Sequence, residues 1–430
     1  MDYAQAVKFH EEIKAYGSIL GLDSMRALMR QLGDIWRHLP AVHVAGTNGK
    51  GSVCCFAASA LKEAGYRVGQ YSSPAVFHLR ECCQINGQWI SEEEYASCMQ
   101  DVSDACRRMQ EEGLRHPTVF EAETALAFLW FYRQKCDIVL LEAGMGGSTD
   151  ATNVIEHPLC SVFTSIGMDH MQFLGNSIVE ITRVKAGIIK RGCPVVSAAR
   201  QGESGRILRE CASALNASFH EALPMEEAYA ENGALICRHP VLGELRLSMG
   251  GSYQENNASL AISVIGLLRQ AGYSVSDSQL RRGIERAVWP GRFERISFHP
   301  PFYIDGAHNP DAALELKKSL LAHFGNKKKI GIMGVMADKP YKEMARILLP
   351  CFDQIFTVTP DNPRALCSLE LAKEITACGG QAHEAADIKD AVRLSYAAAR
   401  KESGVAVAFG SLFYLKEVKD ALFQLTGQLP

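Results

Sequence analysis

Short runs of apolar, often β-branched residues alternate along the first half of the chain with longer stretches whose apolar positions recur every three or four residues. Short runs of this kind are typical of buried strands, and the longer stretches are typical of helices packed on a sheet. The alternation therefore predicts parallel α/β units. The expected strands are 41–45, 68–71, 137–142, 159–165 and 194–197, and the expected helices are 49–64, 92–110, 120–133, 178–190, 205–215, 255–271 and 277–287.

Two interruptions divide this pattern. Residues 219–247 read as a small antiparallel insertion with a turn at Asn232-Gly233, and the pattern breaks again at Trp289-Pro290-Gly291, before a segment with two prolines. A second α/β series follows, with strands expected at 302–305, 330–333, 354–357 and 405–409. We therefore expect an α/β protein with a P-loop-type, mostly parallel sheet in residues 1–291 and a smaller, Rossmann-like α/β domain in residues 292–430, the two facing each other across a cleft.

The composition restricts the class of function. The chain has 430 residues, 47% of them hydrophobic and 22% charged, which is typical of a soluble globular protein with a large core. Its formal charge of -3 gives no overall basic field, so we expect no nucleic-acid partner. No run of 18 apolar residues occurs, and residues 1–14 carry charges along their length and lack the apolar core of a signal peptide, which predicts a cytoplasmic protein with no membrane contact. The 14 cysteines form no CxxC pair, so we expect reduced thiols.

A glycine-rich turn joins the first predicted strand to a helix. Residues 41–52 read AVHVAGTNGKGS. Glycines allow backbone N–H groups to converge on phosphate oxygens, and a lysine and a hydroxyl at the helix start add charge and a further donor. This pattern predicts a nucleoside triphosphate site made by Gly46, Thr47, Asn48, Gly49, Lys50, Gly51 and Ser52. Only two residues separate the first glycine from Gly49-Lys50, against four in the usual P-loop, and a plain glycine turn with a solvated lysine is the alternative.

A phosphate loop of this kind requires Mg²⁺, whose oxygen ligands are expected at the carboxyl ends of neighbouring strands. Three predicted strand ends offer candidates: Ser72-Ser73, Glu142 and Asp169-His170. Glu142 precedes a second glycine-rich stretch, AGMGGSTDATN, which can pass close to a ligand. A solvated carboxylate at Glu142 and an ordinary histidine at position 170 are the alternatives.

A series of motifs in fixed order carries a family resemblance. They are GTNGKGS (46–52), SSP (72–74), EAGMGGSTDATN (142–153), MDH (168–170), KAGIIK (185–190), YQENN (253–257), PGRFE (290–294), DGAHNP (305–310), MADKP (336–340) and FGS (409–411). Together they resemble the folylpolyglutamate synthase family, which includes dihydrofolate synthases, within the Mur ligase superfamily. The resemblance covers essentially the whole chain.

The resemblance implies a reaction and a set of roles. The N-terminal domain is expected to be an ATPase, and the C-terminal domain to bind L-glutamate and part of the nucleotide. ATP is expected to phosphorylate a folate carboxylate, and the amine of L-glutamate to displace phosphate. The matched motifs imply catalytic roles for Lys50, Lys185 and His308, nucleotide contacts by Asn257, Arg292 and Asp305, and glutamate contacts by His308 and Ser411. They also imply two Mg²⁺ ions held by Ser73, Glu142, His170 and Lys185, the last as a carbamate. Separately, we expect a monomer.

Two departures and several alternatives remain open. Cys82 stands where arginine is common in the family, and Ser148-Thr149 stands where many bifunctional members have Arg followed by an apolar residue, which leaves dihydrofolate synthase activity open. A cell-wall Mur ligase would have a UDP-binding domain before the loop, whereas 45 residues precede Gly46. A GTPase would have an NKxD motif, which is missing. A P-loop kinase, or another Mur-type ligase acting on a different carboxylate, is the remaining alternative.

Overall fold

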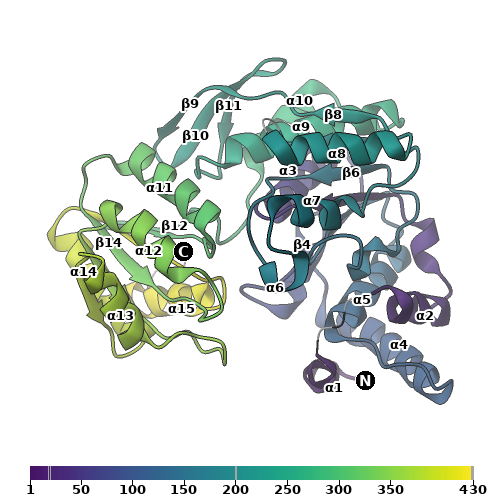
Figure 1. Ribbon diagram of the computed structural model, residues 1–430, viewed down its shortest axis with the longest axis horizontal. Helices are drawn as coiled ribbons and strands as arrows, with labels where there is room; N and C mark the ends of the chain where they lie inside the picture. The colour runs from purple at the N-terminus through teal and green to yellow at the C-terminus, as the bar shows by residue number, and fades with distance from the viewer. Residues whose placement is uncertain (18, 20, 199–200, 428–430) are drawn as a thin grey trace. The chain divides into compact units, whose positions relative to one another are not determined.

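The computed structural model describes residues 1–17, 19, 21–198 and 201–427 (Figure 1). The chain forms two compact units, and each is described by itself. The first consists of Met1–Pro224, His239–Leu242 and Asn256–Ala287, and the second of Met225–Arg238, Gly243–Glu255 and Val288–Pro430. In the described part of the chain, no helix is long and apolar enough to cross a membrane.

The first unit is built on an eight-stranded sheet in the order β4-β3-β2-β5-β1-β6-β7-β8. The strands are β1 (Ala41–Ala45), β2 (Val68–Tyr71), β3 (Cys83–Ile85), β4 (Gln88–Trp89), β5 (Ile138–Glu142), β6 (Cys160–Phe163), β7 (Val195–Ser197) and β8 (Phe219–Glu221). The neighbouring strands β2, β5, β1, β6, β7 and β8 pair in parallel, and β3 and β4 form an antiparallel edge next to β2. Every residue of β1 and β5 is buried, as expected of central strands covered on both faces.

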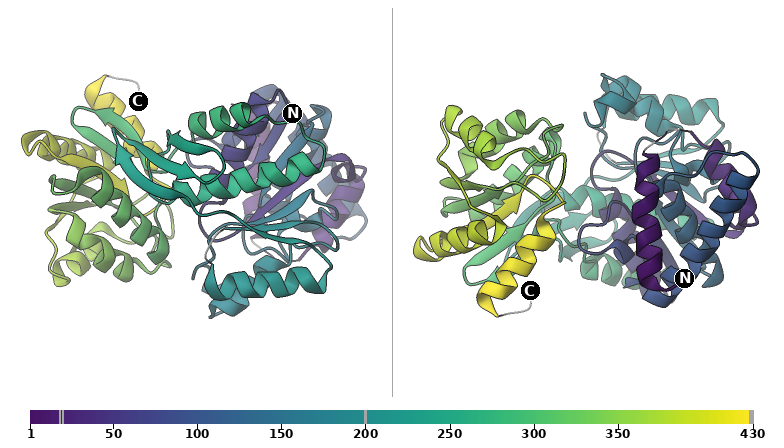
Figure 2. Two further views of the ribbon diagram at one scale, coloured as in Figure 1. Left: turned by 90° about the horizontal axis from the view of Figure 1, so that it is seen from above. Right: turned by 90° about the horizontal axis from the view of Figure 1, so that it is seen from below.

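Helices cover both sides of this sheet (Figure 2). They are α1 (Tyr3–Ile13), α2 (Asp23–Gln31), α3 (Lys50–Glu63), α4 (Glu92–Glu111), α5 (Val119–Arg133), α6 (Met171–Leu174), α7 (Ile178–Ala186), α8 (Gly202–Ala214), α9 (Gln254–Gln270) and α10 (Asp277–Arg286), with 3₁₀ turns at Lys14–Tyr16, Ile35–His38, Leu79–Cys82 and Ala151–Val154. Capping boxes start α4 and α5. The hydroxyl oxygens of Ser91 and Thr118 accept the N–H groups of Glu94 and Glu121, and the carboxylates of these glutamates accept the N–H groups of the two cap residues.

The second unit contains two sheets. A three-stranded antiparallel sheet has the order β11-β10-β9, and a six-stranded sheet has the order β12-β13-β17-β14-β15-β16. The strands are β9 (Glu226–Glu231), β10 (Ala234–His239), β11 (Gly243–Leu247), β12 (Glu294–Phe298), β13 (Pro301–Ile304), β14 (Lys329–Met333), β15 (Gln354–Thr357), β16 (Ala382–Glu384) and β17 (Val405–Phe409). The helices are α11 (Pro310–Phe324), α12 (Tyr341–Leu348), α13 (Ser368–Ala377), α14 (Ile388–Lys401) and α15 (Leu415–Thr426), with a 3₁₀ turn at Leu349–Cys351.

The predicted fold class, a large, mostly parallel sheet followed by a separate C-terminal α/β sheet domain, is confirmed. The predicted turn at Asn232-Gly233 is also present, with φ values of 52° and 84° between β9 and β10. None of the 14 cysteines, all of which lie in the described ranges, forms a disulfide.

Three expectations about the fold differ from the structure. Residues 219–221 were predicted to belong to the antiparallel insertion, but they form β8 and pair in parallel with β7. No strand was predicted at 294–298, yet these residues form β12, which pairs antiparallel with β13; Pro301 is tolerated because it occupies the first position of β13. A single boundary near 291 was expected, whereas segments 225–238 and 243–255 belong to the second unit.

Candidate active site at the phosphate loop

The loop between β1 and α3 depends on close contacts that only glycine allows. Gly49, which caps α3, has φ +91°, and a Cβ added there would collide with the side-chain amide of Asn257. A Cβ on Gly46 would collide with the hydroxyl of Thr164, the residue that follows β6. The sequence therefore folds the backbone of residues 46–49 tightly onto its neighbours and leaves the start of α3 as an anion-binding helix terminus.

Hydrogen bonds fix this loop to the segment after β6. The Thr47 N–H donates to the Ser165 carbonyl at 2.7 Å, and the Thr47 hydroxyl both donates to the Gly167 carbonyl and accepts from the Gly167 N–H, each at 3.0 Å. The Ser165 hydroxyl donates to the Asn48 carbonyl at 3.1 Å. The loop is thus held in shape by the protein itself.

Two lysine side chains converge on one carbonyl oxygen of the loop. Lys50 Nζ donates to the Gly46 carbonyl at 3.3 Å and to the Thr47 carbonyl at 3.1 Å, and Lys185 Nζ donates to the same Gly46 carbonyl at 2.8 Å. Lys185 is only 4% exposed, and burial together with the charge of Lys50 lowers its pKa from 10.5 to about 7. The convergence of these amines creates a site that favours an anionic ligand.

The four predicted metal-binding residues occupy different settings in the first unit. Glu142 ends β5, is buried, and lies 3.9 Å from Lys50 Nζ. Ser73 follows β2 and is half-buried. His170 has φ 50°, its side chain is 42% exposed, and its N–H donates to Asp169 Oδ1 at 2.8 Å. Within the described residues, no group of three or more His, Cys, Asp and Glu side chains is arranged to hold a metal ion. Glu142 and Lys185 thus adjoin the phosphate loop through Lys50 and Gly46.

The second unit holds Asp305, His308 and Ser411 at one edge of its larger sheet, whereas Asn257 lies in the first unit. Asp305 directly follows β13 and is 3% exposed; Oδ2 accepts Tyr253 Oη–H at 2.8 Å and the Phe293 N–H at 2.9 Å, and Oδ1 accepts the Ala307 N–H at 2.8 Å. Burial raises the pKa of this carboxyl, opposed by its hydrogen bonds and by Arg292. Ser411 lies just beyond the adjacent strand β17, and its hydroxyl accepts the Phe413 N–H at 3.2 Å. His308 Nδ1 lies 2.8 Å from the Gly306 carbonyl.

Comparison with known proteins decides the family. Two family models match the chain: one described as Mur ligase middle domain over residues 44–199, and one described as Mur ligase, glutamate ligase domain over residues 291–412. The chain is 36% identical over 429 residues to a dihydrofolate synthase/folylpolyglutamate synthase of Bacillus subtilis (strain 168), which covers 96% of this chain and 97% of the relative. It is 31% identical over 376 residues to a folylpolyglutamate synthase of Lacticaseibacillus casei, covering 85% and 87%.

The chain belongs to the folylpolyglutamate synthase family of Mur ligases. A solved structure agrees: Mycobacterium tuberculosis folylpolyglutamate synthase, complexed with ADP and AMPPCP, matches with a TM-score of 0.89 at 27% identity over 100% of both chains. These findings confirm the predicted family and the predicted enzyme class, an ATP-dependent amide-forming ligase.

Sequence reasoning missed a group of buried polar residues beside the site of this family member. Asp150 is 4% exposed and organises the glycine-rich stretch after Glu142, and Thr152 and His43 are fully buried next to it. Burial raises the pKa of Asp150, opposed by hydrogen bonds from Thr152, Met145 and Gly144. One sequence feature could have pointed to this group: His43 is a polar residue inside the otherwise apolar strand AVHVA, and no family motif accounts for it.

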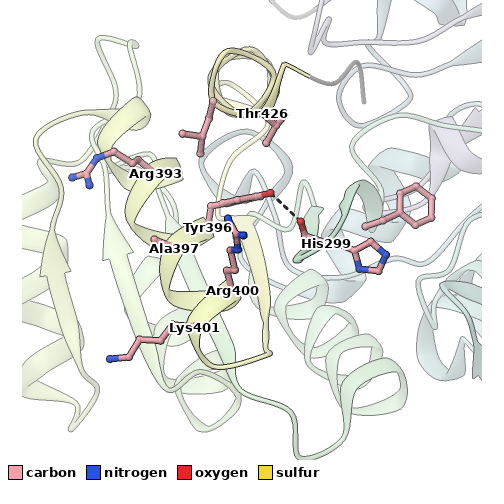
Figure 3. Close-up of a pocket in the computed structure, with 9 residues that line it drawn as sticks. His299, Arg393, Tyr396, Ala397, Arg400, Lys401 and Thr426 are labelled. Atoms are coloured by element: carbon pink, nitrogen blue, oxygen red, sulfur yellow. Dashed lines mark hydrogen bonds between the residues drawn. The ribbon is translucent and has the colours of Figure 1, made fainter.

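A hollow of about 760 Å³ in the second unit is separate from all predicted site residues. It is lined by basic, aromatic and aliphatic side chains of β12, α14 and α15 and of the turn after β12: Phe298, His299, Arg393, Tyr396, Ala397, Arg400, Lys401, Leu425 and Thr426 (Figure 3). Tyr396 Oη donates to the His299 carbonyl at 2.9 Å, Arg393 is paired with Asp390 at 2.6 Å, and Arg393 and Lys401 extend away from His299 in Figure 3. Its positive charges therefore do not converge on one point.

Two glycines at opposite ends of α3 provide a matched test of the loop. Gly49 and Gly65 both have φ +91°, but a Cβ on Gly65 would meet nothing within 4 Å. Both Gly49→Ala and Gly65→Ala should lower the free energy of unfolding by about 1–2 kcal/mol because alanine is strained at positive φ. Only Gly49→Ala should also weaken ADP binding, by about tenfold or more, because the clash with Asn257 displaces the phosphate loop. Calorimetric titration with ADP measures this, and equal ADP affinities in the two variants would contradict the assignment of the loop.

Proposed function

We propose that this chain joins L-glutamate to the carboxylate of a folate, with ATP as the source of energy. The observation that carries the proposal is the phosphate loop, in which Lys50 and Lys185 meet at the Gly46 carbonyl with Glu142 beside Lys50. The relatives named as folylpolyglutamate synthases support the choice of substrates.

The reaction follows from the chemistry of a carboxylate. A carboxylate resists attack by an amine until one of its oxygens becomes part of a good leaving group. Transfer of the γ-phosphoryl group of ATP to the folate carboxylate gives an acyl phosphate and ADP. The neutral amine of L-glutamate then attacks the acyl carbon, the C–O bond to phosphate breaks, and the nitrogen loses a proton to give the amide. Phosphoryl transfer needs mainly positioning and charge neutralisation, which Lys50 and the N–H groups at the start of α3 can supply.

Mg²⁺ fits the donors at this site. Glu142 offers buried carboxylate oxygens, the ligand type that Mg²⁺ prefers, and we assign it to one ion together with the Ser73 hydroxyl. His170 and Lys185 are assigned to a second ion. When bound, Mg²⁺ neutralises charge on the phosphates. Lys185 as an ammonium donates to Gly46 and cannot ligate a cation, so its role requires the carbamate, which forms only from the neutral amine.

The second unit is assigned the remaining contacts. Arg292 and Asp305, with Asn257 of the first unit, are proposed to hold the nucleotide, and His308 and Ser411 to hold L-glutamate. Under this assignment, residues 1–291 form the predicted ATPase domain and residues 292–430 form the predicted glutamate-binding domain. A monomeric state and a cytoplasmic location also stay predictions.

One assay separates a ligase from a kinase. A purified ligase should release ADP and inorganic phosphate in equal amounts only when ATP, Mg²⁺, a reduced folate and L-glutamate are all present, because phosphate leaves only when the amine attacks. A kinase would form ADP without L-glutamate and keep phosphate on its product. Steady ADP formation that does not depend on L-glutamate would therefore refute the proposal. Dihydropteroate in place of the folate tests the dihydrofolate synthase activity in the same way.

Lys185 provides a prediction that depends on pH. Since its pKa is lowered to about 7, the amine is mostly protonated at pH 6 and mostly neutral at pH 8, and only the neutral form reacts with CO₂. NMR with ¹³C-bicarbonate in the presence of Mg²⁺ and an ATP analogue should show a carbamate signal that grows from pH 6 to pH 8. Lys185→Ala should abolish the signal and most activity, and acetate or formate should restore part of the activity by occupying the vacated site. Full activity of Lys185→Ala, or no carbamate signal in active enzyme, would show that Lys185 is not a metal ligand.

A further inference from the structure

A chain of hydrogen bonds links β1 to the glycine-rich loop that follows Glu142. His43 Nε2 lies 2.8 Å from Thr152 Oγ1, and the Thr152 hydroxyl lies 2.5 Å from Asp150 Oδ1. Asp150 Oδ1 also accepts the Thr152 N–H at 3.0 Å, and Oδ2 accepts the Met145 N–H at 2.8 Å. His43 and Thr152 are 0% exposed and Asp150 is 4% exposed, so water does not compete for these bonds.

The donors and acceptors allow only one direction along this chain of bonds. Burial raises the pKa of Asp150, but each of its oxygens accepts a backbone N–H, which opposes that effect and favours the ionised carboxylate, and an ionised carboxylate can only accept. The single hydroxyl hydrogen of Thr152 is therefore donated to Asp150, and Thr152 Oγ1 must accept from His43 Nε2–H. His43 is neutral, because burial and the charge of Lys190 lower its pKa to about 3. In the described part of the chain, its Nδ1 has no hydrogen-bond partner, as expected of the unprotonated nitrogen.

The network holds the end of the loop that adjoins Glu142. Met145, whose N–H is bound by Asp150, lies three residues after Glu142. The other end of the loop is held separately: the Ser148 N–H donates to the Val184 carbonyl of α7 at 2.9 Å, and Asn153 Nδ2 donates to the Ser148 carbonyl at 3.1 Å. Directly after Glu142, the Ala143 N–H donates to the Val44 carbonyl of β1 at 2.9 Å. From Met145 onward the loop is held by Asp150, whose orientation depends on Thr152 and His43.

We infer that His43 and Thr152 are positioning residues for the phosphoryl-transfer site. They orient the Asp150 carboxylate, which fixes the loop after β5 and so holds Glu142 at its place beside Lys50. Thr152 lies within the motif of residues 142–153, but the family resemblance implied no role for it or for His43, and neither residue lies directly at a strand end. The consequence for Mg²⁺ rests on the proposed function, whereas the anchoring of the loop does not.

Conservative pairs of variants test this inference. Thr152→Val removes the hydroxyl and keeps the shape, while Thr152→Ser keeps the hydroxyl. His43→Phe removes the donor, while His43→Gln retains an N–H that can donate. Thr357→Val is the matched control, because Thr357 is also 0% exposed and its hydroxyl makes one bond, to the Ser368 carbonyl at 2.9 Å, in the other unit.

The first measurement is hydrogen–deuterium exchange on the free protein, which requires no activity. Amides of residues 144–147 should exchange about tenfold faster in Thr152→Val and His43→Phe, because the Met145 anchor opens more often. They should be unchanged in Thr152→Ser and Thr357→Val. Exchange in Thr152→Val and His43→Phe that matches the wild type would overturn the inference, and the His43 pair retains this test if Thr152→Val fails to fold.

The second measurement is the Mg²⁺ dependence of the ligase reaction. The Mg²⁺ concentration for half-maximal rate should rise about tenfold or more in Thr152→Val and His43→Phe, as for the loss of a residue that orients a metal ligand. The KM for L-glutamate should not change, and Thr152→Ser and His43→Gln should recover most of the wild-type Mg²⁺ dependence. A general loss of stability would change the Mg²⁺ dependence and the KM for L-glutamate together. Thr357→Val, which removes a buried hydroxyl away from the network, shows how large that general effect is. Faster exchange without a change in Mg²⁺ dependence would overturn the positioning of Glu142.

Discussion

The Gly46 carbonyl accepts hydrogen bonds from two lysines, Lys50 and Lys185, and much of the first unit can be understood from this one contact. Two ammonium groups so close together repel each other, and the repulsion grows as water is excluded. The protein meets this constraint by lowering the pKa of the more buried Lys185 and by placing Glu142 near Lys50. Both arrangements reduce this repulsion, while the Lys50 ammonium and the N–H groups at the start of α3 remain to bind the negative charge of a triphosphate.

The surrounding fold brings Lys50, Lys185 and Glu142 together at the phosphate loop. β1 lies between β5 and β6, so the loop after β1, the carboxylate that ends β5 and the segment after β6 all meet at the carboxyl edge of one parallel sheet. α7 brings Lys185 to the same edge, and the His43–Thr152–Asp150 network fixes the loop after Glu142. The second unit has the same arrangement: Asp305 and Ser411 follow the adjacent parallel strands β13 and β17 and so lie at the carboxyl edge of that sheet.

The parts that sequence could predict are those fixed by local patterns. The strand 41–45, the glycine loop and the helix after it are defined by contiguous residues, so their positions follow from composition and spacing. The network around Asp150 could not be predicted from local pattern alone. Met145 and Thr152 are close to Asp150 in the sequence, but His43 reaches Thr152 only through the position of β1 in the folded sheet. The three-residue strand β8 was too short to distinguish from the insertion beside it, and the membership of 225–238 and 243–255 in the second unit depends on tertiary packing.

The central claim is that a carboxylate is activated by phosphoryl transfer at the loop of residues 46–52. Isotope transfer tests this claim most directly. A folate whose glutamate carboxylates carry ¹⁸O is converted by the enzyme with unlabelled ATP and L-glutamate, and the released inorganic phosphate is analysed by mass spectrometry. An acyl phosphate intermediate predicts that each phosphate contains one ¹⁸O from the carboxylate, because the C–O bond breaks when the amine attacks. Amide product formed with phosphate that contains no ¹⁸O would contradict the account.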